Sequence, residues 1–255
     1  RVNSNMVIMG KSGSGKSFST KTILTHLAAE NSKIFILDPE NEYEELAKNL
    51  GGRLIDVGTA SEGRINPFHI ITNLDADESE GFAPSVNNFA VHLQFLEEFF
   101  RVALDGISSE AVEYLNNLIV ELYQLKHINS RTDLSKLRAE DFPTFSELCT
   151  LIDKKLGEAK IDYDVVQLRT LHNYISKFGG DGRNANLWNG ASTLSIKENF
   201  TVFNFQSLLA NKNAVIANAQ MLLVLKWLDN EIIKNRDFNI KHGSNRKIII
   251  VIDEA

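Results

Sequence analysis

The sequence predicts an α/β fold, in which a mostly parallel sheet is flanked by helices and interrupted by an inserted all-α subdomain. Apolar runs alternate with helical stretches over the first sixty residues, and a long block of helical periodicity separates them from further apolar runs. Strands that alternate with helices form parallel sheets through crossover connections. We therefore expect residues 1–82 and 191–255 to form the core, with the insertion and a turn-rich loop at 83–190.

The first part of the core should contain three strands and two helices. Short apolar runs predict strands at MVIM (6–9), KIFILD (33–38) and RLIDVG (53–58). KIFILD lacks alternation, which is typical of a strand buried on both faces. The helices are expected at 17–30, where apolar residues recur at helical spacing, and at 41–52, which ends at glycine.

The insertion is predicted to be helical from about residue 86 to 178, where long amphipathic runs follow one another. Thr144, followed three residues later by Glu147, predicts a capped helix start. The run HLQFLEEFF is expected in the core of the insertion, with a groove for a partner as the alternative. The turn-rich loop 179–190 could grip a partner, although we favour packing in the core for Trp188.

The last part of the core returns to strand and helix. NFTVFNF (199–205) predicts a strand, residues 214–235 a long buried helix, and KIIIVID (247–253) a final strand. The runs at both ends of the chain lead us to expect a fragment of a longer protein.

Composition limits the classes of function. The 255 residues include 43% hydrophobic residues, enough for a sizeable core, and carry a net charge of −6, which argues against a dedicated nucleic-acid binder. The only cysteine is Cys149, so neither an intrachain disulfide nor a cysteine-based zinc site is expected, which fits a reducing cytoplasm. No apolar run approaches the roughly 20 residues that span a bilayer.

A phosphate-binding loop is predicted between the first strand and the first helix. Gly10, Gly15, Lys16 and Ser17 match the pattern G-x-x-x-x-G-K-[ST]. Glycines let the backbone N–H groups surround phosphates, the helix start adds positive potential, and Lys16 reaches the β- and γ-phosphates. Ser17 would ligate Mg²⁺. The expected nucleotide contacts are Gly10, Lys11, Ser12, Gly13, Ser14, Gly15, Lys16, Ser17 and Phe18.

Acidic residues follow two of the predicted strands. Asp253 and Glu254 end the last strand, where P-loop enzymes carry a carboxylate behind Mg²⁺ and a second that activates water. A surface pair is the alternative. Asp38, Glu40 and Glu42 could face the nucleotide or a neighbouring subunit, or they could cap a helix, and the sequence does not decide.

Arg64, beside the tract INPF, could contact phosphate across an interface. We favour a solvated loop arginine for this position.

Five tracts in this order resemble one group of proteins: MGKSGSGKS, ILDPENEY, RINPF, VFNFQSLL and IIIVIDEA. They are similar to the HerA/FtsK superfamily of P-loop ATPases, and within it to conjugative-transfer and type IV secretion ATPases of the TraC/TraE/VirB-four type. The resemblance implies a P-loop NTPase core of the RecA-like kind. It is strong at these tracts and weak between them.

The resemblance also implies site residues, cofactors and partners. Lys16 and Glu254 would be catalytic, and Ser17 and Asp253 would hold Mg²⁺ with ATP. It implies a hexameric ring, other secretion-channel subunits as partners, and a place in the bacterial cytoplasm at the inner face of the membrane, reached through partners or through parts outside this chain. A fragment that ends at the Walker B strand would hydrolyse ATP weakly.

Two alternatives remain open at this point. One is a DNA-translocating pump of the HerA/FtsK type, which the net charge does not support. The other is a nucleotide-gated docking subunit with little turnover.

Overall fold

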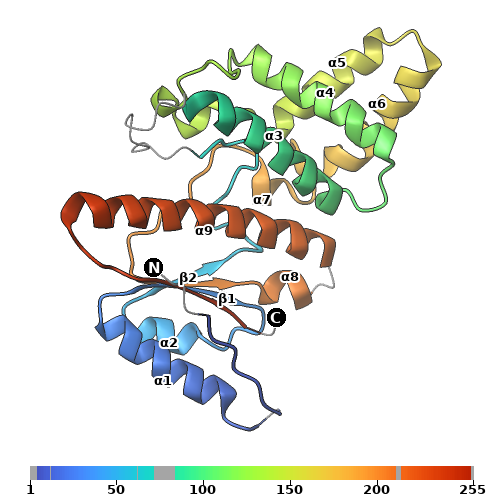
Figure 1. The fold of residues 1–255 in the computed structure, drawn as a ribbon. Coiled ribbons are helices and arrows are strands. Elements are labelled where there is room, and N and C mark those ends of the chain that lie inside the picture. Colours follow the sequence, from blue (N-terminus) through green and yellow to red (C-terminus); the bar gives the residue numbers. More distant parts are fainter. Residues whose placement is uncertain (1–4, 12, 62, 72–83, 211–213, 254–255) are drawn as a thin grey trace.

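The computed structural model describes residues 5–11, 13–61, 63–71, 84–210 and 214–253. Its sheet has four parallel strands in the order β2-β3-β1-β4, as Figure 1 shows at the centre of the molecule. The strands are β1 (Lys33–Asp38), β2 (Arg53–Asp56), β3 (Phe200–Asn204) and β4 (Ile248–Ile252). The predicted α/β fold with a parallel sheet is confirmed.

Helices cover both faces of this sheet. On one face, α1 (Lys16–Ala29) and α2 (Glu44–Asn49) pack on Ile34 and Ile36 of the central strand. On the other face, Trp227 of α9 (Ala214–His242) meets the rings of Phe35 and Phe203. Neighbouring residues of β1 thus point to opposite faces and are buried on both, as the lack of alternation in KIFILD predicted. The short helix α8 (Gln206–Ala210) follows β3.

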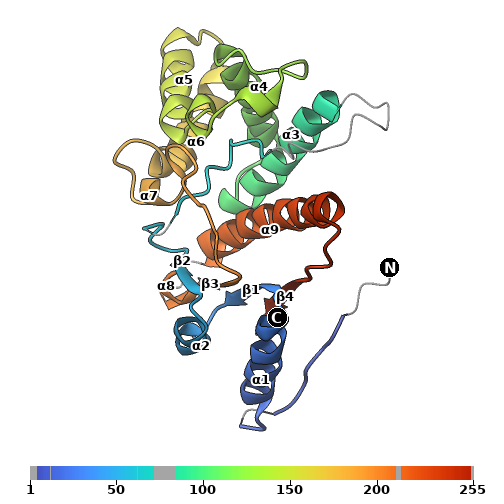
Figure 2. The same cartoon turned by 90° about the vertical axis from the view of Figure 1, so that its left-hand side faces the viewer.

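A second layer of helices lies beyond α9, on the side away from the sheet (Figures 1 and 2). Its longer members are α3 (Pro84–Ala103), α4 (Ser109–Leu125), α5 (Phe145–Glu158) and α6 (Asp162–Ile175). The shorter ones are α7 (Ala185–Trp188) and the 3₁₀ turns η2 (Leu134–Lys136), η3 (Ala139–Asp141) and η4 (Ser176–Phe178). The α5 start carries the predicted capping box of Thr144 and Glu147. Helix α3 packs against α9 and joins the two layers.

Aromatic side chains fill the helical layer. The ring of Trp188 lies against Phe99, Phe145 and Phe178, and all four are enclosed. The Trp188 indole donates to the Gln220 side chain of α9 at 2.6 Å. This confirms packing in the core for Trp188. It also confirms the core interpretation of HLQFLEEFF, whose phenylalanines are buried here.

The predicted strand at residues 6–9 is wrong. These residues have no regular structure, and Met6 and Met9 are 66% and 87% exposed. The described ladders are β1–β3, β1–β4 and β2–β3, so residues 6–9 make no ladder hydrogen bonds among the described residues. A short apolar run favours a strand, but the strand forms only where a neighbouring strand supplies hydrogen-bond partners.

Other element boundaries shift for local reasons. Helix α2 begins three residues later than predicted because the backbone after β1 turns first, with Asn41 in the left-handed region at φ 61°. Strand β2 ends at Asp56, whose carboxylate accepts from the Gly58 N–H at 2.9 Å and turns the chain. Helix α9 extends to His242, past the predicted end at 235.

Across the described part of the chain, no helix has both the length and the apolar character that crossing a membrane requires.

Candidate nucleotide-binding site

The loop at residues 10–17 leads directly into α1, which begins at Lys16. Gly13 and Gly15 have φ values of 77° and 85°, in the left-handed region that favours glycine. The loop is tightened by a hydrogen bond of 3.1 Å from the Ser14 N–H to the Lys11 carbonyl. Ser12 lies outside the described residues. Two glycines of the motif therefore adopt backbone angles that other residues rarely take.

The start of α1 suits an anion. Gly15 precedes the helix and offers no side chain to cap it, and the first turn holds no acidic residue. The first N–H groups of a helix carry partial positive charge and need acceptors from outside the helix. A phosphate supplies such acceptors, so the residues present fit the phosphates of a nucleotide.

Lys16 folds back along the loop. A Cβ atom at Gly10 would come within 2.4 Å of the Ser14 Oγ and 3.2 Å of the Lys16 Cγ, so a larger residue there would require both side chains to move. Lys16 and Ser17 are half-buried, whereas Phe18 is exposed. The ammonium and the hydroxyl that the motif predicts for phosphate and Mg²⁺ therefore lie at the helix start.

A row of polar residues follows the carboxyl ends of the four strands. The strand register pairs Asp56 with Asn204 and Asn204 with Asp38. It also pairs Leu37 with Ile252, so the next position brings Asp253 beside Asp38, and the Asp253 N–H donates to the Leu37 carbonyl at 3.2 Å. In order along the edge the row is Asp56, Asn204, Asp38 and Asp253. Parallel sheets bind ligands at this edge.

Asp38 serves the backbone in this row. It is 0% exposed, and its carboxylate accepts from the N–H groups of Glu42 at 3.1 Å and Tyr43 at 2.9 Å. These bonds hold the turn into α2, which is the helix-capping alternative. Glu40 is exposed and Glu42 is half-buried. The structure therefore gives Asp38 a structural task at the edge of the site.

Asn204 and Asp56 were not anticipated as members of this edge. The Asn204 amide donates to the Asn41 side chain at 2.9 Å, and Asp56 accepts from the Ser207 hydroxyl at 2.6 Å. The sequence shows only that a polar residue follows each of these apolar runs. Strand pairing is needed to show that the four polar residues lie in one line along the edge of the sheet.

Tyr43 was also missed. It is enclosed between α1 and the sheet, with the Lys21 ammonium 5.3 Å from the centre of its ring. Burial and the nearby charges of Asp253, Glu42 and Asp38 raise the pKa of the Tyr43 phenol far above its usual value. The residue therefore stays protonated and connects α1 with the ends of β1 and β4.

The two predicted halves of the site occupy the same side of the molecule. In Figure 1 the phosphate loop lies at the right-hand end of α1, below the carboxyl ends of the strands, which also point to the right. The loop is not held at the sheet edge by a strand, since residues 6–9 form none. The prediction that the loop follows a first strand is therefore wrong. Glu254 lies outside the described residues.

Arg64 lies away from this edge. Its side chain donates to the Asn186 carbonyl at 3.3 Å, and its backbone N–H donates to the Thr193 hydroxyl at 2.9 Å. Its carbonyl accepts from the N–H groups of Thr193 and Leu194. Arg64 thus ties the tract before INPF to the loop that leaves the helical layer.

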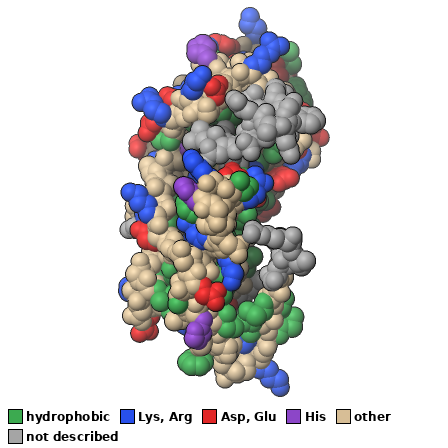
Figure 3. Space-filling view, turned by 60° about the vertical axis from the view of Figure 1, so that its left-hand side comes forward, with side chains coloured by type: hydrophobic (Ala, Val, Ile, Leu, Met, Phe, Trp, Pro, Cys, Tyr) green, Lys and Arg blue, Asp and Glu red, His purple; other side chains and the backbone are tan. Residues whose placement is uncertain are grey.

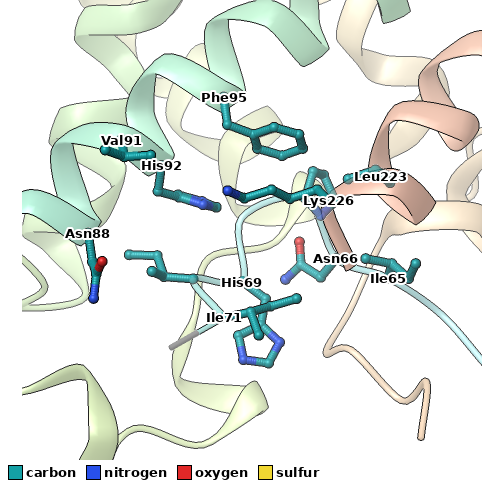
Figure 4. A pocket seen from close by; sticks show the side chains of 12 residues that line it. Ile65, Asn66, His69, Ile71, Asn88, Val91, His92, Phe95, Leu223 and Lys226 are labelled. Carbon is teal, nitrogen blue, oxygen red and sulfur yellow. The ribbon is translucent and has the colours of Figure 1, made fainter. Parts of the chain in front are cut away.

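A small cavity of about 70 Å³ lies elsewhere, where α3 meets α9 (Figure 4). Figure 4 shows His92 and Lys226 turned toward each other in it. Burial, with a smaller effect of the Lys226 charge, lowers the pKa of His92 to about 3, so its imidazole is neutral. The His92 Nε2 lies 3.0 Å from the Tyr123 hydroxyl, which donates to the Phe68 carbonyl. This cavity is too small for a nucleotide and belongs to the joint between the layers.

Comparison with known proteins agrees with this geometry. The profile of the family described as helicase HerA, central domain, matches residues 2–221. The solved structure of VirB4 of Thermoanaerobacter pseudethanolicus is similar with a TM-score of 0.76 at 27% sequence identity, over 94% of this chain and 81% of that chain. No curated protein matches the sequence.

Proposed function

Because the chain belongs to the family of the HerA helicase central domain, a family of P-loop ATPases, we propose that it is a motor domain that binds and hydrolyses ATP to energise a type IV secretion or conjugation apparatus. The observation that carries the proposal is the phosphate loop at the start of α1, within a chain that aligns with VirB4 over 94% of its length. The apparatus would move DNA or protein.

The chain's own residues would have separate tasks in this reaction. The N–H groups of the loop and the Lys16 ammonium bind the phosphates, and Ser17 and Asp253 hold Mg²⁺. Glu254 orients the attacking water and accepts its proton. Mg²⁺, when bound, neutralises charge that develops on the phosphate oxygens. The half-buried Lys16 and Ser17 at the helix start, and Asp253 at the end of β4, support these assignments.

The test of ATP binding is the variant Lys16→Ala. We expect loss of most affinity for ATP, since the lysine is the only side-chain cation that the motif directs at the β- and γ-phosphates. Binding is measured with a fluorescent ATP analogue. Lys48→Ala is the matched control, because Lys48 is exposed on α2 and pairs with Glu44. Unchanged affinity in the Lys16 variant would show that the loop does not bind nucleotide.

A DNA-translocating pump is the second candidate, favoured by the match to a helicase family. Two observations weigh against it. The net charge is −6, and on the face shown in Figure 3 basic and acidic side chains are interspersed. A surface that follows a DNA backbone gathers lysine and arginine along one path. We therefore rank the secretion motor first. A docking subunit that binds ATP with little turnover is the remaining alternative.

The organisation of the protein completes the proposal. Residues 1–82 and 191–255 would form the ATPase core and residues 83–190 the insertion. Six copies would form a ring with nucleotide sites between subunits, next to other secretion-channel subunits at the inner face of a bacterial membrane. The similarity to VirB4 supports an oligomeric ATPase that works with other secretion subunits.

A further inference from the structure

The cavity where α3 meets α9 is built by both layers of the molecule (Figure 4). Helix α3 contributes side chains from the helical layer, and α9 contributes them from the helix that covers the sheet. Residues between 65 and 71, in the segment that follows β2, complete the wall. The volume is about 70 Å³, and one water needs roughly 10–15 Å³ of such a volume. The cavity can therefore hold a molecule of about five non-hydrogen atoms.

The wall of this cavity combines apolar side chains with a few polar ones, and Lys226 is the one charged group among the described residues that line it. Burial is the main cause that lowers the pKa of His69 to about 4 and that of His92 to about 3, so both imidazoles are neutral at pH 7. No aspartate or glutamate belongs to the described lining. The cavity therefore carries one positive charge without a counter-charge.

Lys226 is half-buried, yet it makes neither an ion pair nor a hydrogen bond with any residue that the structure describes. Figure 4 shows its side chain turned into the cavity toward His92. Its ammonium lies 5.8 Å from the centre of the Phe95 ring, near the limit of a cation–π contact. The half-buried Lys33, by contrast, pairs with Glu231 at 2.7 Å. The Lys226 ammonium thus keeps its three N–H donors available to a ligand.

Two more polar side chains at this joint lack partners among the described residues. Asn230, one turn after Lys226 on α9, is 6% exposed, and neither its amide nitrogen nor its amide oxygen is hydrogen-bonded there. The Nδ1 atom of His69, a lining residue, is also enclosed and unpaired. Buried polar groups nearly always bond to protein, to water or to a ligand. The joint is therefore suited to a polar ligand rather than a purely apolar one.

We propose that this cavity binds a small carboxylate, whose oxygens accept from the Lys226 ammonium while its carbon chain contacts the apolar part of the wall. One fixed cation matches a single negative charge, whereas a divalent oxyanion would bring a charge that nothing in the described lining balances. The carboxylate belongs either to a short free acid or to a glutamate side chain of a partner.

A ligand at this place would connect the two layers, because α3 and α9 both line the cavity. The inference does not rest on the proposed function, since the sheet and α9 lie between this cavity and the phosphate loop (Figure 1).

The test uses propionate and propionamide, which have nearly the same shape and differ in charge. Binding is followed by saturation-transfer NMR of each compound at constant ionic strength. We expect propionate to bind saturably and propionamide to bind at least about tenfold more weakly, because hydrogen bonds between charged groups are the stronger ones. Lys226→Met keeps a chain of similar length without the charge, so it should also weaken propionate at least about tenfold. Lys241→Met, an exposed position on the same helix, is the matched control and should bind like the wild type.

Thermal unfolding gives a second readout. Propionate should raise the melting temperature of the wild type and of Lys241→Met, and leave that of Lys226→Met unchanged, because only a ligand that binds the folded state stabilises it. Without ligand, Lys226→Met should melt no lower than the wild type, since the half-buried cation that it removes has no described partner of opposite charge. A clearly lower melting temperature would overturn the inference, because it would show that the fold itself uses this charge.

Three results would show that the inference is wrong: no saturable binding of propionate, equal binding of propionate and propionamide, or tighter binding of sulfate than of propionate. The peptides Gly-Glu-Gly and Gly-Gln-Gly distinguish the two sources of the carboxylate. Displacement of propionate by Gly-Glu-Gly alone would identify a site for a partner's side chain, and displacement by neither peptide would identify a site for a free acid. Both of these results keep the carboxylate site. Failure of the site would leave the proposed function untouched, because ATP binding is tested separately with Lys16→Ala.

Discussion

The buried carboxylate of Asp38 accepts hydrogen bonds from two backbone N–H groups. Asp38→Ala would leave both donors without a partner, so we expect the free energy of unfolding to fall by roughly 2–4 kcal/mol. Urea denaturation measures the change. Asp38→Asn is the control, because its amide keeps one acceptor oxygen and should cost less. Equal stability of the alanine variant and the wild type would show that water replaces the carboxylate.

Glu254 carries a different expectation, since its proposed task is chemical. Glu254→Gln keeps the size of the side chain and removes the base, so we expect binding of ATP to persist and hydrolysis to fall by about 10²-fold or more. Single-turnover hydrolysis of bound ATP separates the two effects. Asp229→Asn, on α9, is the control for loss of one carboxylate outside the site. Normal turnover in Glu254→Gln would remove Glu254 from catalysis.

At the scale of elements, an ion pair joins β1 to α9. The Lys33 ammonium lies 2.7 Å from the Glu231 carboxylate, and both side chains are largely buried. Burial acts to raise the pKa of Glu231, but the hydrogen bond and charge of Lys33, with help from Lys234, outweigh it and lower that pKa. The stability that Glu231 contributes is therefore present above its unfolded pKa and lost as the pH falls through the folded one.

Lys33→Met tests this pair. It leaves Glu231 buried with Lys234 alone, so we expect the protein to lose roughly 2–3 kcal/mol at pH 7. The loss should shrink as the pH falls and Glu231 takes up a proton. The double variant Lys33→Met/Glu231→Leu should recover much of the stability, because no charge is left buried. Urea denaturation at several pH values measures all three proteins. A loss that is the same at every pH would contradict the assignment.

The elements differ in how far the sequence could predict them. The helix at 214–235 and the strand KIFILD were predicted well. In both, the local sequence already favours the element that forms, and the neighbours in the fold reinforce it. MVIM at 6–9 was not, because four apolar residues do not say whether a partner strand exists. Asp38 was ambiguous for a similar reason. A carboxylate at the end of a strand gives the same sequence pattern whether it binds a ligand or accepts hydrogen bonds from a turn.

At the scale of the molecule, the candidate site and the helical layer lie apart. The phosphate loop and α2 are on one face of the sheet, and α3–α7 lie beyond α9 on the other (Figure 1). The motif residues could be predicted because their spacing is local. Tyr43 and the row from Asp56 to Asp253 depend on strand order and were visible only in the fold. The sheet and α9 thus separate the helical layer from the phosphate loop.

The charge of the molecule bears on whether DNA stimulates the proposed ATP turnover. The net charge is −6, and basic and acidic side chains are interspersed on the face shown in Figure 3. DNA binding scales with the counterions that phosphate contacts release, and such contacts need clustered lysine and arginine. We therefore expect duplex DNA to change ATP turnover by less than about twofold at moderate salt. Turnover is measured with and without duplex DNA at two salt concentrations, with Lys16→Ala as the background. Strong stimulation that salt weakens would instead favour a DNA pump, since contacts to DNA phosphates weaken as the salt concentration rises.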